Sequence, residues 1–332
     1  MDPYGGEMSA ETGVNRTTDE RSERDARLST AINESDVIRR HSGEVAWPTV
    51  LLCAGLVTTY VTTTAGWLAG SLPLWVACAI NSALSYAFFT VHHDATHKAI
   101  SGRNARWRWL DPALGTIAGI PLQFSYRGFT AQHLRHHAHT NDRSRDPDAF
   151  VIGTVWTLPL KWIAVVILRT LSSLPFCEPL EAKATARFAP DIPEPSPRVE
   201  LEMRRNRRAI QIGTGVLLTS IPVGLFAPVF FLWWLPGRIG TLPLMVFFSW
   251  LPHIPFDSTA RFLNTRINTF RGSTWLLLHQ DRHLIHHLYP SVPWYRYRAV
   301  FREVRPLLEA KGARIEGRDS NTHQPITLHV VT

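Results

Sequence analysis

Two stretches of the chain, HLRHHAHTN at His133–Asn141 and HLIHHLYPS at His283–Ser291, share the pattern His-Leu-x-His-His. Residues three and four positions apart project from the same face of a helix. Each stretch is therefore predicted to present three convergent imidazoles, and neutral imidazole is a ligand for zinc, iron, copper and nickel. The alternative for each stretch is a polar helix face without a metal. Two such triplets in one chain favour a metal site.

The other histidines are distributed just as unevenly. Of the 15 histidines, twelve lie in four short windows, which include HHDATH at 92–97 and the single His253 in WLPHIPF. A zinc ion is satisfied by about three or four protein ligands, whereas eight or nine convergent imidazoles can hold two six-coordinate ions. The motif HExxH of zinc proteases does not occur. We therefore predict a site for two iron ions.

Long apolar stretches predict a helical membrane protein. Trp47–Ala69 runs for 23 residues without a charge, and at about 1.5 Å per residue such a helix crosses a hydrocarbon core of about 30 Å. Leu74–Val91 is a second uncharged run, and two further crossings fit between 209 and 251. The stretches 109–124 and 151–174 are shorter or carry prolines and charges. They predict a re-entrant or interfacial segment and a surface helix, respectively.

The distribution of arginines predicts how these helices are oriented. Arginines flank the third span at 204–208 and fill the segment 98–145, whereas the hairpin turns carry almost none. The positive-inside rule then places both termini and the loop from 92 to 208 in the cytoplasm. The predicted fold is all-α, with four transmembrane helices in two hairpins at the plasma or inner membrane. A cytoplasmic helical cap would hold the metal site, since an even number of crossings separates the histidine windows.

Composition divides the chain into three predicted parts. Residues 1–46 are rich in charged and hydroxyl side chains, which predicts disorder, and they contain no apolar run typical of a secretory signal. Residues 47–312 form the membrane domain, and 313–332 form a polar tail. The net charge of +8 lies beside apolar stretches, which favours membrane lipid over nucleic acid as the partner. The three cysteines lack the spacing of a zinc or disulfide site.

Residues near the histidine windows are candidates to orient the metal ligands. A ligating histidine commonly donates its second N–H to a carboxylate or carbonyl group, which fixes the tautomer. The alternative for the acids is a solvated loop position or an ion pair with a nearby arginine. The candidates are His92, Asp94, His139, Asn141, Asp146, Asp148, Ser249, His279 and Asp281.

Three segments together resemble the histidine boxes of the membrane fatty acid desaturase superfamily. They are HDATHKA at 93–99, HLRHHAHTNDRSRDPDAF at 133–150 and HLIHHLYPSVPWYRY at 283–297. Within this superfamily, WLPHIPF at 250–256 and LLEAKG at 307–312 are most similar to carotenoid β-ring hydroxylases of the cyanobacterial type. The resemblance covers about residues 45–312. HQDRH at 279–283 departs from the Asn-Tyr that carotenoid-type members tend to have before the third box.

The resemblance implies a histidine-only di-iron centre that uses O2 to oxidise a membrane lipid, with ferredoxin or a similar protein as electron donor. Carried over position by position, the implied ligands are His93, His97, His133, His136, His137, His253, His283, His286 and His287. The implied reaction is hydroxylation of a carotenoid β-ring, and desaturation of a fatty acyl chain is the alternative. A non-enzymatic membrane metal-binding protein is a further alternative, although its histidines would be expected to line a path across the spans.

Overall fold

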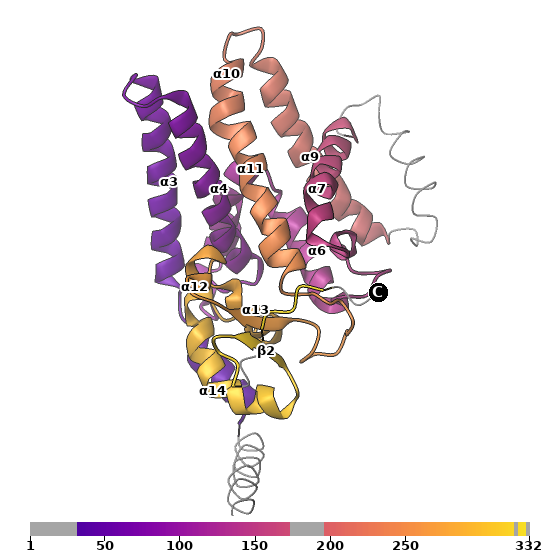
Figure 1. Cartoon of the computed structure of the whole chain (residues 1–332). Helices are drawn as coiled ribbons and strands as arrows, with labels where there is room; N and C mark the ends of the chain where they lie inside the picture. The colour runs from indigo at the N-terminus through magenta and orange to yellow at the C-terminus, as the bar shows by residue number, and fades with distance from the viewer. Residues whose placement is uncertain (1–31, 173–195, 322–324, 330–332) are drawn as a thin grey trace, which may run out of the picture.

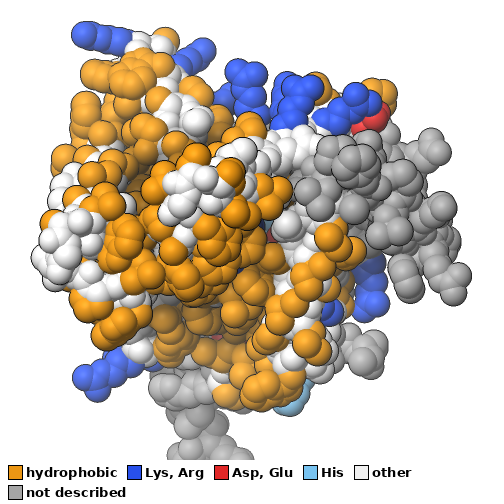
Figure 2. Space-filling view, turned by 90° about the horizontal axis from the view of Figure 1, so that it is seen from above, with side chains coloured by type: hydrophobic (Ala, Val, Ile, Leu, Met, Phe, Trp, Pro, Cys, Tyr) orange, Lys and Arg blue, Asp and Glu red, His pale blue; other side chains and the backbone are white. Residues whose placement is uncertain are grey.

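The computed structural model describes residues 32–172, 196–321 and 325–329 of the chain. The fold is mostly helical. Long helices lie side by side, and shorter elements form a separate unit at one end of them (Figure 1). Seen along the long helices from the opposite end, the surface is largely hydrophobic, with Lys and Arg around its edge (Figure 2). This distribution is typical of helices that lie in a bilayer and end in its charged interface.

Three helical segments of the described residues are long and apolar enough to cross a membrane. The first two are α3 (Trp47–Leu68) and α4 (Leu74–Thr96), which are joined by a short turn and pack together. The third is the continuous segment Phe226–Trp250. It consists of α10 (Phe226–Val229), the π-helix η4 (Phe230–Trp234), α11 (Leu235–Leu244) and the π-helix η5 (Met245–Trp250). The prediction of an integral membrane protein agrees with these segments.

The predicted fourth crossing is not among them. α9 (Pro197–Thr219) has 23 residues, but its first half carries Glu and Arg, and its apolar half begins only at Ala209. The apolar part from 209 to 219 is about 16 Å long at about 1.5 Å per residue, short of a hydrocarbon core of about 30 Å. The described residues therefore contain three helices of spanning length and composition, whereas the sequence analysis predicts four.

Two helices lead from α4 to the first histidine triplet. α5 (Leu110–Leu122) packs along α4 and ends at Gln123, whose φ of 57° turns the chain. α6 (Tyr126–His139) then begins with the side chain of Ser125 accepting a hydrogen bond from the backbone N–H of Gly128. α5 is too short to span, in agreement with the predicted re-entrant or interfacial segment. Short 3-10 turns lie before α5 and after α6, at η1 (Ala105–Trp107), η2 (Ala149–Val151) and η3 (Val155–Thr157).

α7 (Leu158–Ser172) occupies the stretch for which a surface helix is predicted. The described part of this helix is 15 residues long and packs against α9. It carries several exposed apolar side chains, including Leu160, Ile163 and Ile167. Exposed apolar side chains of this kind suit a helix that lies against the bilayer.

The C-terminal unit, residues 263–320, contains a small sheet that the sequence analysis misses. β1 (Arg266–Thr269) pairs in parallel with β2 (Arg314–Gly317), with Ile267 opposite Ile315. The all-α prediction is therefore wrong here, because runs of four residues are too short for an alternating pattern to stand out. The predicted polar tail begins with β2. Between the strands lie α12 (Ser273–Leu276), η6 (Gln280–Arg282), α13 (His283–Leu288), η7 (Trp294–Arg296) and α14 (Tyr297–Ala310).

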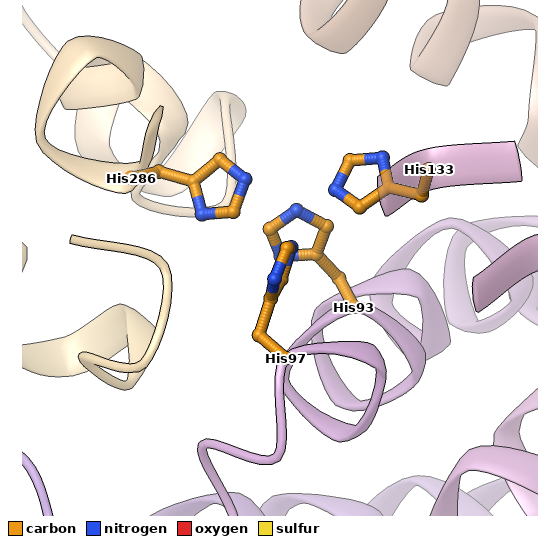
Figure 3. Close-up of side chains that lie close together, drawn as sticks. All are labelled: His93, His97, His133 and His286. Carbon is orange, nitrogen blue, oxygen red and sulfur yellow. The ribbon is translucent and has the colours of Figure 1, made fainter. Parts of the chain in front are cut away.

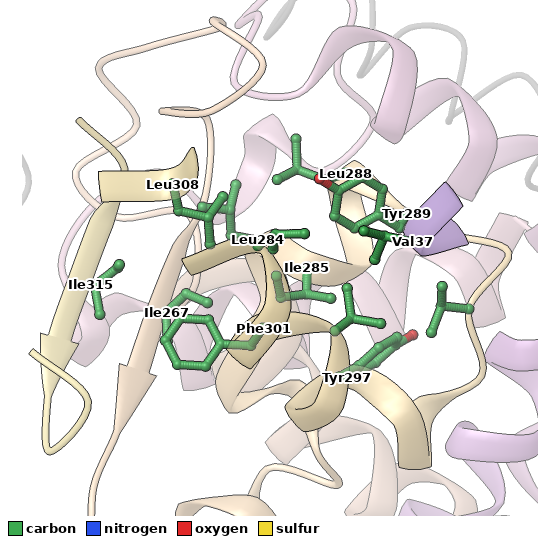
Figure 4. Packing of buried hydrophobic residues seen from close by; sticks show 13 residues of the cluster. Val37, Ile267, Leu284, Ile285, Leu288, Tyr289, Tyr297, Phe301, Leu308 and Ile315 are labelled. Atoms are coloured by element: carbon green, nitrogen blue, oxygen red, sulfur yellow. The ribbon is translucent and has the colours of Figure 1, made fainter. Parts of the chain in front are cut away.

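A hydrophobic core holds this unit together (Figure 4). α13 contributes Leu284 and Ile285, and α14 contributes Tyr297 and Phe301. The apolar residues between the histidines of the second triplet are thus core residues. Because α13 buries its apolar face in this core, its histidine face is turned toward α4 and α6.

α2 (Glu34–His41) also packs on this core, although the sequence predicts disorder for this region. Asn33 caps the helix through a 3.0 Å hydrogen bond from the backbone N–H of Ser35, and Val37 is buried in the core. Arg40 forms an ion pair with Glu303 of α14. The prediction is wrong for these residues because the apolar face of a helix this short finds its partner only in the tertiary fold. Residues 1–31, the rest of the predicted disordered part, lie outside the described residues.

A buried ion pair in the C-terminal unit gives a test of this fold. Arg266 is fully buried and donates to Glu316 Oε2 at 2.8 Å and to the carbonyl oxygen of Thr327 at 2.9 Å. Glu316→Ala would leave the guanidinium buried without a carboxylate, and we expect a loss of about 3–5 kcal/mol in the free energy of unfolding.

The control is Asp257→Ala, which breaks the more exposed pair with Arg314 and should cost about 0–1 kcal/mol. Thermal unfolding of the purified protein in detergent measures both. Equal melting temperatures for Glu316→Ala and the unmodified protein would contradict the role assigned to this ion pair.

Candidate metal centre

The structure brings together all nine histidines that the sequence analysis proposes as metal ligands. They form two groups of four and one bridging residue, with the ring nitrogens of each group within 4.8 Å of one another. Cluster 1 consists of His93, His97, His133 and His286 (Figure 3). Cluster 2 consists of His136, His253, His283 and His287. His137 lies with His286 and His287, between the two clusters.

Each triplet is divided between the clusters. On α6, His133 belongs to cluster 1 and His136 to cluster 2, while on α13 His286 belongs to cluster 1 and His283 to cluster 2. One helix face therefore serves two neighbouring sites. This division explains why the same spacing of three histidines occurs twice in the sequence.

The separations between ring nitrogens fit metal ions. His137 Nε2 lies 2.8 Å from His286 Nε2 and 3.1 Å from His133 Nε2. In cluster 2, the Nε2 atoms of His283 and His287 are 3.1 Å apart. Metal–nitrogen bonds are about 2.0–2.1 Å long, so two ligands at right angles would place their nitrogens about 3 Å apart.

Unpaired nitrogens point to the same conclusion. The Nε2 atoms of His93 and His97 are buried and make no hydrogen bond within the described part of the chain. Buried polar atoms normally have a partner, and a cation among the four imidazoles of cluster 1 would supply it. A donor set made only of imidazole suits iron, zinc or copper better than magnesium or calcium. The histidine clusters therefore fit a metal site.

Burial keeps most of these imidazoles neutral. Burial, together with the charge of neighbouring histidines, lowers the pKa of six ligand candidates well below the ordinary value of histidine. The six are His133, His137, His253, His283, His286 and His287. A neutral imidazole has a free lone pair, so the fold holds these rings in the form that binds a metal.

His136 is the exception, and its partner is one of the predicted orienting residues. Burial lowers the pKa of His136, but the hydrogen bond to Asp146 and the nearby charge of Asp148 outweigh burial and raise it. His136 Nδ1 lies 2.8 Å from Asp146 Oδ1, so the Nδ1–H is fixed and Nε2 is left for a metal. Asp146 is held in turn by the backbone N–H of Asn141, at 2.8 Å.

Asn141 fastens this loop to the segment before β1. Its φ of 66° lies in the left-handed region, which asparagine tolerates better than most residues. Its side-chain amide donates to the carbonyl oxygens of Ser258 and Asn264, at 2.7 and 2.8 Å. Asp146 and Asn141 therefore support cluster 2, the first directly and the second through the backbone.

Asp148 and Ser249 face each other beside the clusters. Ser249 Oγ donates to Asp148 Oδ2 at 2.9 Å, and both residues line a cavity of about 180 Å³. His93, His133, His136 and His283 form one wall of that cavity, and the other walls are mostly aromatic and aliphatic. The cavity thus connects the two clusters with an apolar space between α4, α6, α7, α9 and α11.

Four other candidates lie outside both clusters. His92 donates its Nδ1–H to the carbonyl oxygen of Gly115 at 2.8 Å and packs among aromatic rings. His279 packs between the rings of Trp275 and Trp294. Asp94 accepts hydrogen bonds from Thr49 Oγ1 and from the backbone N–H of Trp294. His139, at the end of α6, belongs to neither group of nitrogens.

Asp281 holds the loop before the second triplet. Its Oδ2 accepts from Ser273, Thr274 and Arg282 at 3.0, 2.8 and 2.8 Å. These partners are not ligand histidines, so its effect on the site is indirect. Together with Asp94, it fixes the position of the segments that flank α13.

Gln280 and Tyr297, which are not among the predicted orienting residues, do contact ligand histidines. Gln280 Oε1 lies 2.9 Å from His283 Nδ1, and the Tyr297 hydroxyl lies 3.1 Å from His286 Nδ1. A glutamine three residues before a ligand histidine is a usable signal, because i and i+3 side chains are neighbours. Tyr297 lies eleven residues after His286, and no local pattern relates the two.

Comparison with protein families identifies the type of protein. A model of the fatty acid desaturase family matches residues 39–318. The chain belongs to this family. Its members are membrane di-iron oxidoreductases, and the histidine clusters described above lie within the matched residues.

Individual relatives are distant and differ in activity. The chain is 24% identical over 218 residues to a β-carotene ketolase of Paracoccus sp., covering 64% of this chain and 73% of that enzyme. It is 25% identical over 311 residues to a chloroplastic omega-6 fatty acid desaturase of Glycine max, covering 84% and 68% of the two chains. A match to an sn-1 oleoyl-lipid 12-desaturase of Picosynechococcus sp. is 30% identical, but it spans only 30% of this chain and 27% of that enzyme.

Substitution of one cluster 2 residue tests the assignment of ligands. His136→Ala removes an imidazole and leaves Asp146 without its partner, so we expect turnover to be lost and iron content to fall to about one ion per chain. His139→Ala, on the same helix but outside both clusters, is the matched control and should retain iron and most activity. Elemental analysis and product formation measure the two effects. Normal iron content and turnover in His136→Ala would contradict the assignment.

Proposed function

We propose that this protein uses O2 and two iron ions to oxidise an unactivated C–H bond of a membrane lipid, and that the reaction is hydroxylation of a carotenoid β-ring. The observation that carries the proposal is the pair of histidine clusters in the wall of an apolar cavity. One ion would be held by cluster 1 and the other by cluster 2, with His137 available to either. Bound iron would supply the activation of O2 that organic side chains cannot provide.

The chain itself positions the substrate and excludes water. Phe89, Phe129 and Phe248 line the cavity next to His93 and His133, and their rings pack edge to face or stack on the ligand histidines and on one another. An apolar lining accepts a hydrocarbon, strengthens electrostatic interactions at the metals and keeps water from competing for the oxidant. The aromatic wall thus directs a hydrocarbon toward the clusters.

Carotenoid hydroxylation is favoured over acyl desaturation by the residues around the boxes. WLPHIPF and the HHAHTND extension resemble carotenoid hydroxylases, and the match to a β-carotene ketolase covers 73% of that enzyme. Acyl desaturation remains the second candidate, because the omega-6 desaturase match covers 84% of this chain. Both reactions begin with removal of hydrogen from a C–H bond, so the same metal site can serve either.

A non-enzymatic metal-binding protein is less well supported. A metal path across the membrane needs ligands along the spans. The clusters instead combine the end of α4 with α6, α13 and the loop after η5. Four of the histidines also form one wall of a cavity that suits a substrate.

Product analysis tests the reaction. We expect expression of the chain with a ferredoxin and its reductase in a β-carotene-producing bacterium to yield hydroxylated carotenoids, detected by chromatography. A strain that expresses His136→Ala is the control and should retain β-carotene. Unchanged pigments together with new unsaturated acyl chains would instead establish the desaturase.

Either reaction needs an external electron donor. Hydroxylation consumes O2, two protons and two electrons besides the two electrons of the C–H bond, and desaturation has the same requirement.

We propose that the donor is an acidic protein such as a ferredoxin, and that it docks in the groove between α6 and α9. Arg127, Arg198 and Arg205 line this groove, together with Leu134 and Leu201. The clusters and both termini would then face the cytoplasm.

The position of the groove supports electron delivery. Leu134 lies in the groove wall, and its chain neighbour His133, about 100° away around α6, belongs to cluster 1. A helix with its side chains is about 10–12 Å across, so a donor seated there would be separated from the clusters by α6 alone. The arginines would attract an acidic donor and accelerate its association.

Charge reversal tests the docking site. We expect Arg127→Glu combined with Arg205→Glu to slow reduction of the iron by reduced ferredoxin at least about tenfold at low salt, since these charges steer association. Reduction by dithionite, which needs no docking, should be unchanged. Arg302→Glu, an exposed position on α14, is the control. Equal rates for the double variant and the control would contradict this docking site.

A further inference from the structure

Gln280 and Tyr297 each contact one ligand candidate, in different clusters. Gln280 Oε1 lies 2.9 Å from Nδ1 of His283 in cluster 2. The Tyr297 hydroxyl lies 3.1 Å from Nδ1 of His286 in cluster 1. Each cluster therefore has one ligand candidate whose Nδ1 faces the oxygen of one of these two side chains.

The direction of each of these hydrogen bonds follows from the chemistry of the donors. The Nε2 atoms of His283 and His286 face other imidazole nitrogens at 3.1 and 2.8 Å, so they are the atoms available to a metal. A neutral imidazole that binds through Nε2 carries its proton on Nδ1. His283 must then donate to the oxygen of Gln280, and His286 must donate to the oxygen of Tyr297.

The orientation of the Gln280 amide determines the tautomer of His283, because the amide oxygen is the atom that faces His283 Nδ1. Reversing the amide would point an N–H at His283 Nδ1 and require the other tautomer, in which Nε2 carries the proton and cannot bind a metal. The Tyr297 oxygen determines the tautomer of His286 by accepting from its Nδ1–H.

Both residues are held rigidly enough to enforce this arrangement. Gln280 and Tyr297 are 3% and 1% exposed. Asp281 anchors the turn that carries Gln280 through its contacts with Ser273 and Thr274. Asp94 accepts a hydrogen bond from the backbone N–H of Trp294, which lies three residues before Tyr297. The two acids thus hold the segments on which the pair depends.

We propose that Gln280 and Tyr297 are positioning residues that set the tautomers and ring orientations of His283 in cluster 2 and His286 in cluster 1, respectively. The proposal rests on the proposed function only in that the clusters bind iron. It is independent of the lipid substrate and of the electron donor. It also assigns a role to the sequence HQDRH, which departs from the pattern of carotenoid-type relatives at this position.

Three substitutions and a matched control test the proposal. Tyr297→Phe and Gln280→Leu remove one acceptor each, and we expect iron affinity to fall about 10–100-fold, the usual effect of losing a partner of a metal-ligating histidine. Gln280→Glu keeps an oxygen opposite His283 and should restore most of the affinity. Tyr289→Phe is the control, since Tyr289 is a buried tyrosine of the same core whose hydroxyl bonds Glu34 at 2.9 Å.

The measurements are iron titration of the metal-free protein and Mössbauer spectra of the 57Fe-loaded variants. The spectrum of Gln280→Leu should change mainly in the component from cluster 2, and that of Tyr297→Phe in the component from cluster 1. Unaltered iron affinity in both variants would overturn the proposal, and so would an equal loss in Tyr289→Phe, which would show a general packing effect. Failure of the unmodified protein to bind iron would instead overturn the proposed function.

Discussion

The structure depends on the burial of nine imidazole rings in one place. Removing polar nitrogens from water is unfavourable unless each finds a partner, and several of these nitrogens face one another at 2.8–3.1 Å. Two metal ions would satisfy them at once. The surrounding fold must therefore bring α4, α6, the loop after η5 and α13 to the same point, and the cores on either side of the site do so by burying the apolar faces of those elements.

The division of each triplet between two clusters gives the spacing its meaning. His133 and His136 lie about 60° apart around α6, because three steps of about 100° make about 300°, so they diverge and reach different clusters. His137 lies about 40° to the other side of His133, where it meets His286 and His287. On α13, His286 belongs to cluster 1, whereas His283 and His287 belong to cluster 2. A single zinc site would need only two histidines of such a face. A spacing that supplies three neighbouring rings on each of two helices suits a pair of ions.

The sequence predicts much of this site because its pattern is local. The boxes follow helical periodicity, and the uncharged run from Trp47 reveals a spanning helix by length alone. What depends on tertiary contacts is less visible: α2 forms because Val37 meets the C-terminal unit, and β1 and β2 are too short to show alternation. The predicted orienting acids divide similarly. Asp146 contacts a ligand, whereas Asp94 and Asp281 hold segments on which other contacts depend.

These indirect contacts indicate how an all-histidine site can be adjusted without changing its ligands. Asp146 fixes His136 with a carboxylate, Gln280 fixes His283 with an amide, and Tyr297 fixes His286 with a hydroxyl. A carboxylate increases the basicity of its histidine more than a neutral oxygen does. Within cluster 2, His136 is thus a stronger donor than His283. Histidines of both clusters border the cavity, so this difference between the donors would lie on the side where the substrate binds.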